Sequence, residues 1–191
     1  MARALAAAED YPAARSVGRA YCATAPDVCS PRPHAGAVGT IARAYGLDPL
    51  LPYAIMNAES GLDPSVTSPA GARGLMQLMP TLATALAKDV LAGFQIDDLY
   101  RAGVNARLGT TELSLLHRRF GGGGVRPSLP LVIAGYNGGA EAVDRWLKTY
   151  AAPPDADRFA EDISFSETRK YVRRVLGFLQ EYRKVYGDEG G

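Results

Sequence analysis

Glu59 is the residue whose type and surroundings most clearly suggest chemistry. It stands in Ala58-Glu59-Ser60-Gly61, where an apolar helical run over residues 50–58 breaks into a turn. Farther along, the segment Gly71 to Pro80 combines glycines with apolar and sulfur-containing side chains. Burial of a carboxyl group against apolar neighbours raises its pKa, because the charged form loses hydration. Glu59 is therefore a candidate general acid, and a solvated carboxylate at a helix end is the alternative.

The elements that must position Glu59 are predicted to be helices. The pair Asp48-Pro49 is typical of a helix start, and that helix ends near Glu59. Glycines, prolines and serines over residues 60–74 predict a loop. Near the C-terminus, a helix beginning near Ser164 is predicted to bury one face, because its apolar residues recur at i, i+3, i+4 and i+7: Val172, Val175, Leu176 and Leu179. No alternating strand pattern is strong, so the predicted fold class is all-α.

Further helical segments complete the predicted domain. One ends at Gly46, and short pieces lie within residues 75–88. A long helix is predicted from Asp97 to Phe120, with acidic residues at the end that the helix dipole favours. Leu129 to Tyr136 forms another, ended by Asn137-Gly138-Gly139. The glycines at 121–124 predict a flexible connection, and residues 151–156 predict a linker.

Composition limits the classes of protein to which this chain can belong. A length of 191 residues fits one domain. The net charge of +1 gives no electrostatic footprint for nucleic acid or for an anionic membrane. No stretch approaches the roughly 20 apolar residues of a membrane span. The first ten residues contain one Arg and a short Ala-rich run, which predicts no signal peptide.

Cys22 and Cys29 are the only two cysteines in the sequence. Their close spacing allows a local disulfide, which would imply an oxidising compartment, and two unrelated thiols are the alternative. Without a nearby pair of histidines, they do not make a zinc site.

Taken in order, the motifs of this sequence resemble the catalytic domain of the soluble lytic transglycosylases. The matching segments are Glu59-Ser60, Ser68-Pro69, Gly71 to Pro80, residues 134–139 (AGYNGG) and residues 165–172 (FSETRKYV). The resemblance covers residues 36–186 and implies a lysozyme-like α-helical domain related to goose-type lysozyme. Residues 1–35 are then an N-terminal extension and residues 187–191 a C-terminal tail.

The family cleaves the β-1,4 bond between N-acetylmuramic acid and N-acetylglucosamine in peptidoglycan. The resemblance implies that Glu59 protonates the leaving oxygen and later takes a proton from O6 of the muramyl sugar. The product is then a 1,6-anhydro sugar, and neither a metal nor a cofactor is required. The alternatives are a hydrolase of the same fold that uses Asp63 or Glu167 as a second acid, and a non-catalytic peptidoglycan-binding module. Asp63 stands before a proline, which is typical of a turn residue.

The resemblance also implies substrate-binding residues. Ser68, Gln77 and Met79 match residues that line the sugar groove near the glutamate. Tyr136 matches a tyrosine whose hydroxyl lies near the glutamate carboxylate, and Asn137 follows it. Glu167 matches an acid that contacts the muramyl side, and Tyr171 lies one turn later. Simpler roles remain open for several of them. Glu167 also completes a capping box with Ser164, and Met79, like Met76, could belong to the core. Tyr136 could be a buried tyrosine with a hydrogen-bonded hydroxyl.

The same resemblance predicts the surroundings in which the chain works. Peptidoglycan glycan strands are the expected partner, other cell-envelope proteins are further candidates, and nucleic acid is not expected. The chain is predicted to be a monomer in the periplasm or cell envelope.

Overall fold

The chain folds into a set of helices, as its periodicity predicts. The computed structural model describes residues 13–14, 16, 26–121, 129–150 and 156–187. The helices, in chain order, are α3 (Pro26–Cys29), α4 (Ala35–Ala44), α5 (Leu51–Ser60), α6 (Pro80–Val90), the 3₁₀ helix η2 (Ile96–Tyr100), α7 (Ala102–Gly121), α8 (Leu129–Gly138), α9 (Ala140–Leu147), α10 (Ala156–Asp162) and α11 (Ser166–Tyr186). Among the described residues there is no strand, and only isolated bridges join Arg73 to Thr67 and to Leu78. The all-α prediction is confirmed.

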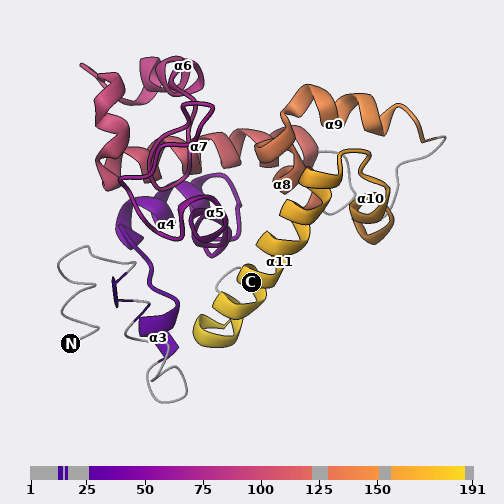
Figure 1. Ribbon diagram of the computed structural model, residues 1–191, viewed down its shortest axis with the longest axis horizontal. Helices are drawn as coiled ribbons and strands as arrows, with labels where there is room; N and C mark the ends of the chain where they lie inside the picture. The colour runs from indigo at the N-terminus through magenta and orange to yellow at the C-terminus, as the bar shows by residue number, and fades with distance from the viewer. Residues whose placement is uncertain (1–12, 15, 17–25, 122–128, 151–155, 188–191) are drawn as a thin grey trace.

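The C-terminal helix α11 organises the packing. It lies against α5 and α8, while α7 packs on α4 and α8. Figure 1 shows α6 and α10 at opposite ends of the molecule, with α11 running from beside α10 past α8 and α5. Through these contacts α11 brings the end of the chain beside the helix that carries Glu59.

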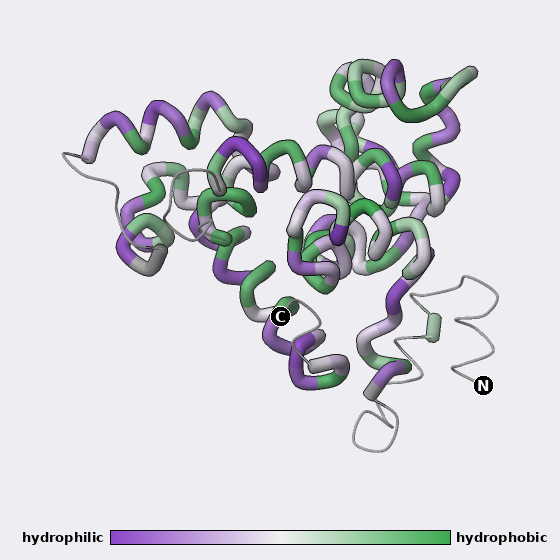
Figure 2. Tube along the Cα trace, turned by 180° about the vertical axis from the view of Figure 1, so that it is seen from behind, coloured by the Kyte–Doolittle hydropathy of each residue, from purple (hydrophilic) through white to green (hydrophobic). Residues whose placement is uncertain are grey.

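The buried face of α11 is the one that the sequence predicts. Val172, Val175 and Leu179 are buried, while Leu176 is half-buried. Hydrophobic and hydrophilic residues alternate along this helix in Figure 2, as expected of an amphipathic helix with one side in water. The apolar side stabilises the fold by burial, which leaves the polar side of α11 free for other roles.

Two apolar clusters form the core. The larger joins α4, α5, α8 and α11, and the smaller joins α6, η2 and α7. Tyr136 packs against both clusters. Its ring therefore lies where the two halves of the core meet.

The prediction of one helix from Asp97 to Phe120 is wrong at its start. The chain forms η2, opens at Arg101 (φ −82°, ψ 111°) and only then begins α7. At this break the carbonyl of Leu99 accepts a hydrogen bond from the Asn105 side chain at 2.9 Å. A capping box between Gln95 and Asp98 starts the short helix.

Two other helix starts differ from the prediction. The helix α5 begins at Leu51 rather than at Pro49, although the Asp48 carboxylate still accepts a hydrogen bond from the amide of Leu50 at 2.9 Å. The capping box predicted at Ser164 is wrong, because α11 begins after Phe165 and has no side-chain cap. Glu167 is instead an exposed residue of the first turn.

Some predictions fall on residues outside the described part of the chain. These are Cys22, all but the last residue of the linker predicted over residues 151–156, and all but the first of the glycines 121–124. Cys29 is not a free thiol, and its predicted pairing with Cys22 stays a prediction. Of the described helices, none is both long and apolar enough to cross a lipid bilayer.

Candidate active site

Glu59 lies in the last turn of α5. The helix ends one residue later, because Gly61 adopts a left-handed conformation (φ 64°). The amides of Gly61 and Leu62 then donate to the carbonyls of Asn57 and Met56. The Glu59 side chain is half-buried, and its Oε1 atom accepts a hydrogen bond from the Tyr171 hydroxyl at 2.6 Å. Residues at the end of α5 and on the first turns of α11 thus meet at one carboxyl group.

The surroundings of Glu59 favour its protonated form. Burial raises the pKa of Glu59 above the ordinary value of 4.5, while the Tyr171 hydrogen bond and the nearby Arg174 guanidinium lower it by smaller amounts. Burial also raises the pKa of Tyr171 well above its ordinary value, and the Glu59 charge adds to that effect. Tyr171 is therefore a fixed hydrogen-bond donor at neutral pH, and Glu59 is a carboxyl group suited to giving up a proton.

Tyr136 lies close to Glu59 but does not bond to it. Its hydroxyl donates to the carbonyl of Met76 at 2.8 Å. Burial, and then the charges of Glu59 and Glu112, raise the pKa of Tyr136 well above its ordinary value. The hydroxyl group that contacts the candidate acid is thus that of Tyr171. Tyr136 instead holds the loop of residues 61–79, which joins α5 to α6.

Asn105 fastens that loop to α7, a role that the sequence analysis missed. Its Oδ1 atom accepts from the amide of Met76 at 2.8 Å, and its Nδ2 atom donates to the carbonyls of Arg73 and Leu99 at 2.8 and 2.9 Å. The side chain is fully buried, so these three bonds replace the water that it loses. No local sequence pattern marks this role, because the groups to which Asn105 bonds belong to other parts of the fold.

The polar residues predicted in this loop also hold its shape. Gln77 has a left-handed backbone (φ 49°), and its side-chain amide donates to the carbonyls of Val66 and Gly74 at 3.0 and 2.9 Å. The Ser68 hydroxyl oxygen accepts from the amide of Ala72 at 3.0 Å. Each keeps part of its hydrogen-bonding capacity: the Gln77 carbonyl oxygen and the Ser68 hydroxyl proton.

The two methionines of the loop differ in their exposure to solvent. Met76 is fully buried in the larger apolar cluster. Met79 is 41% exposed and precedes α6. Only Met79 is therefore accessible to a ligand.

Asn137 and Glu167 lie on neighbouring helix ends. Asn137 is exposed, and its Oδ1 atom accepts a hydrogen bond from the buried Thr168 hydroxyl at 2.8 Å. Glu167 precedes Thr168 and stands one helical turn before Tyr171. The structure thus brings Glu59, Tyr136 and Tyr171 together from three helices, and places Asn137 and Glu167 at the neighbouring helix ends.

Glu112 is a second carboxylate that the sequence analysis did not identify. It is half-buried on α7, on the helix stripe that begins with Asn105 and Gly109, and no hydrogen bond or ion pair joins it to any described residue. Burial, and then the charge of Glu141, raise its pKa. Asp63, in contrast, accepts bonds from the amide and hydroxyl of Ser65 at 2.8 and 2.6 Å, as a turn residue does.

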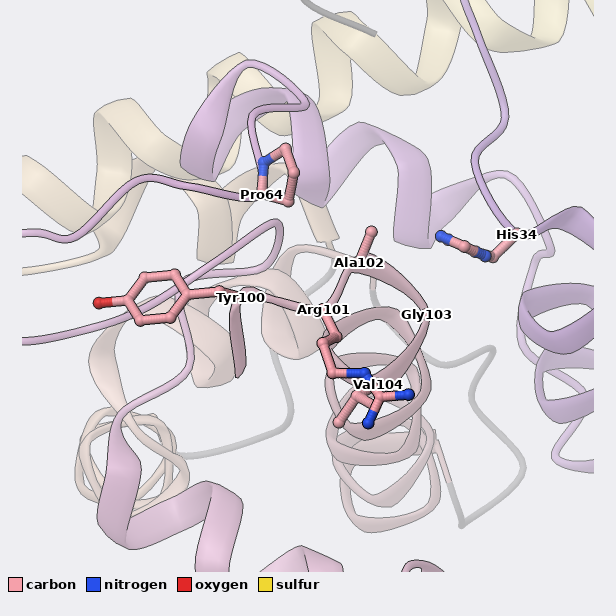
Figure 3. Close-up of a pocket in the computed structure, with 7 residues that line it drawn as sticks. All are labelled: His34, Pro64, Tyr100, Arg101, Ala102, Gly103 and Val104. Atoms are coloured by element: carbon pink, nitrogen blue, oxygen red, sulfur yellow. The ribbon is translucent and has the colours of Figure 1, made fainter. Parts of the chain in front are cut away.

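A separate cavity of about 560 Å³ lies beside the start of α7. It is lined by His34, Pro64 and residues 100–104, and none of the predicted site residues belongs to it. Figure 3 shows His34 and Tyr100 at opposite sides, with the start of α7 between them. Within the described residues, no group of His, Cys, Asp or Glu could hold a metal ion. The candidate site is therefore the one around Glu59.

The sequence of this chain is similar to those of known proteins. The transglycosylase SLT domain family matches residues 37–159. The soluble lytic murein transglycosylase of Escherichia coli K12 is 39% identical over 138 residues, which cover 71% of this chain and 21% of the relative. Membrane-bound lytic murein transglycosylase C of Actinobacillus pleuropneumoniae serotype 5b is 33% identical over 167 residues, which cover 78% of this chain and 45% of the relative. The chain thus spans about a fifth to under half of the length of these relatives.

Solved structures give the same result. The crystal structure of the 70 kDa soluble lytic transglycosylase of Escherichia coli superimposes with a TM-score of 0.82 at 29% identity, covering all of this chain and 30% of that one. The same enzyme has also been solved in complex with bulgecin A. An inactive glutamate-to-glutamine mutant of the lytic transglycosylase Slt from Pseudomonas aeruginosa superimposes with a TM-score of 0.77 at 29% identity.

Proposed function

Because this chain belongs to the transglycosylase SLT domain family, we propose that it is a peptidoglycan lytic transglycosylase. It cleaves the β-1,4 bond between N-acetylmuramic acid and N-acetylglucosamine and leaves 1,6-anhydro ends. The single observation that carries the proposal is Glu59, a half-buried carboxyl group with a raised pKa and a tyrosine donor at 2.6 Å. A solved relative with a glutamate-to-glutamine substitution is inactive, which supports a glutamate as the essential group.

We propose that Glu59 acts twice. As an acid it gives its proton to the glycosidic oxygen, and the bond from that oxygen to C1 of the muramyl sugar breaks. The carboxylate then takes the proton from the O6 hydroxyl as O6 bonds to C1, which restores the acid. The Tyr171 hydrogen bond holds Oε1 in place through both steps and stabilises the charged intermediate form of Glu59.

The substrate contacts of this proposal come from the residues around Glu59. Met79 offers an exposed apolar side chain, and Gln77 and Ser68 offer the hydrogen-bonding groups that the loop leaves unused. We also assign substrate contacts to four residues of α8 and α11: Tyr136, Asn137, Glu167 and Tyr171. We propose residues 36–186 as the catalytic domain and residues 1–35 as an extension, working on glycan strands in the periplasm or cell envelope.

Hydrolysis of the same bond is the second candidate function, and Glu112 is the observation that favours it. Hydrolytic glycosidases normally use two carboxylates, and Glu112 and Glu59 are both close enough to Tyr136 for their charges to raise its pKa, after burial. Mass spectrometry of the fragments released from purified cell walls separates the two reactions. Anhydro ends are the expected result. Reducing ends that incorporate oxygen from ¹⁸O-labelled water would replace the lyase with a hydrolase, and no release at all would reject both.

Replacing Tyr171 by phenylalanine is expected to widen the active pH range on its alkaline side. The tyrosine hydroxyl lowers the pKa of Glu59, so its loss lets Glu59 keep its proton to higher pH. The rate at the optimum falls at the same time, because the carboxyl group is no longer held by that bond. A pH profile of kcat for both proteins checks the prediction, and an alkaline limb that moves to lower pH would contradict it.

A further inference from the structure

Arg174 is a cation at the edge of the candidate site. It follows Tyr171 by three residues on α11, and its guanidinium lies over the Tyr171 ring, 5.5 Å from the ring centroid. The same tyrosine bonds to Glu59, and Arg174 is close enough to lower the pKa of that group. Glu59, Tyr171 and Arg174 thus form a continuous row from α5 to α11.

The guanidinium of Arg174 is available to a ligand. The residue is exposed, and among the described residues it makes no hydrogen bond or ion pair. Its neighbour Arg173, which is also exposed, pairs with Glu161 at 3.7 Å. The tyrosine ring restricts where the Arg174 guanidinium can lie, which reduces the entropy that a contact would cost.

Arg174 lies on the same stripe of α11 as two of the proposed substrate-binding residues. Glu167, Tyr171 and Arg174 stand at i, i+4 and i+7, so they form one stripe along the helix. Glu167 lies on one side of the Tyr171–Glu59 contact and Arg174 on the other, about 4.5 Å along the axis from Tyr171 at 1.5 Å per residue. Arg174 therefore lies close to Glu59 rather than at a distant part of the surface.

We propose that Arg174 binds a carboxylate of the substrate and so favours muramyl-containing strands over neutral glycans. The inference rests on the proposed function, since it concerns the same site. A planar guanidinium binds carboxylates through paired hydrogen bonds, and its place over the aromatic ring leaves its N–H edge free to do so. Peptidoglycan offers that group in two forms: the carboxylates of the stem peptide, and the lactyl carboxylate that is exposed when the peptide is removed.

Other titratable groups near Glu59 do not supply this contact. Tyr136 on α8 and Tyr171 on α11 are hydrogen-bond donors with raised pKa values, and Glu112 on α7 carries the wrong sign. Arg174 is thus the cation of the described site that acts on Glu59.

Binding in a Glu59→Gln background tests the proposal without depending on turnover. The affinity of Arg174→Gln is compared with that of the parent for three ligands: peptide-bearing strands, strands stripped of peptide by an amidase, and neutral chitin oligomers. We expect about tenfold weaker binding of the carboxylate-bearing ligand, the effect of one charge-assisted contact. Chitin oligomers should bind as before, and Arg174→Lys should restore part of the loss.

The matched control is Arg173→Gln, which removes a positive charge one residue away and should leave all three affinities unchanged. A loss on peptide-bearing strands alone identifies the stem carboxylates, and a loss on stripped strands alone identifies the lactyl group. An equal loss on chitin oligomers, or the same result for Arg173→Gln, overturns the proposal. If the Glu59→Gln parent binds no strand and the unmodified chain cleaves none, the proposed function itself falls, and this inference falls with it.

Discussion

Cleavage of peptidoglycan by the Glu59→Gln protein is expected to fall by at least about 10³-fold. Glutamine has nearly the shape of glutamic acid, but its amide cannot transfer a proton. Because the proposed mechanism uses Glu59 first as acid and then as base, one substitution removes both steps. Release of soluble fragments from purified cell walls measures the effect, and activity within tenfold of the unmodified chain would remove Glu59 from the mechanism.

The stability of the same variant provides its control. The folded-state pKa of Glu59 lies above the ordinary value of 4.5, so ionisation costs more in the folded protein than in the unfolded chain. The stability that the protonated group contributes is complete below about pH 4.5 and is lost as the pH rises through the folded pKa. Glutamine does not ionise, so Tm near pH 7 should equal or exceed that of the unmodified chain, and the difference should vanish at acid pH. A Tm that falls to the temperature of the activity assay would show that the loss of activity reflects unfolding.

Replacing Gly74 by alanine is expected to destabilise the protein by about 3 kcal/mol. Gly74 has φ +77°, a conformation that costs alanine about 1 kcal/mol. A Cβ atom there would also overlap the carbonyl oxygen of Leu99 and the side-chain nitrogen of Asn105. Neither group can move cheaply, because Asn105 is buried and makes hydrogen bonds to Met76, Arg73 and Leu99. Urea unfolding of the two proteins measures the difference in free energy.

Gly71→Ala in the same loop distinguishes the cost of the backbone conformation from the cost of steric overlap by the Cβ atom. Gly71 has φ +87°, but a Cβ atom at this position would meet no other atom within 4 Å. Only the conformational cost of about 1 kcal/mol is therefore expected. Equal destabilisation by the two substitutions would show that the close packing at Gly74 contributes nothing. A Gly74→Ala protein that remains folded should also lose activity, because the carbonyl of Met76, which anchors Tyr136, belongs to the displaced loop.

The helical class and the ordered motifs could be predicted from the sequence alone. Helical periodicity is a local property, so the buried face of α11 could be identified from residues a few positions apart. The end of α5 was predicted just as well, because Gly61 follows Glu59 closely and favours the left-handed conformation. The capping box at Ser164 and the continuous helix before Ala102 are wrong predictions, because tertiary contacts determine the chain's conformation there. The carbonyl of Leu99, for example, bonds to the buried side chain of Asn105 instead of extending the helix.

Which side chains contact each other within the site, in contrast, depends on the tertiary structure. Tyr171 and Glu59 lie 112 residues apart, and Tyr136 and Met76 lie 60 apart, so no local pattern could state that their groups touch. The same holds for Asn105 behind the loop, for Glu112 near Tyr136 and for Arg174 over the Tyr171 ring. Each owes its position to the way α5, α7, α8 and α11 pack, which depends on the shapes of many side chains at once. The raised pKa of Glu59 likewise depends on burial, and burial is a property of the packed helices rather than of the residues on either side of it in the chain.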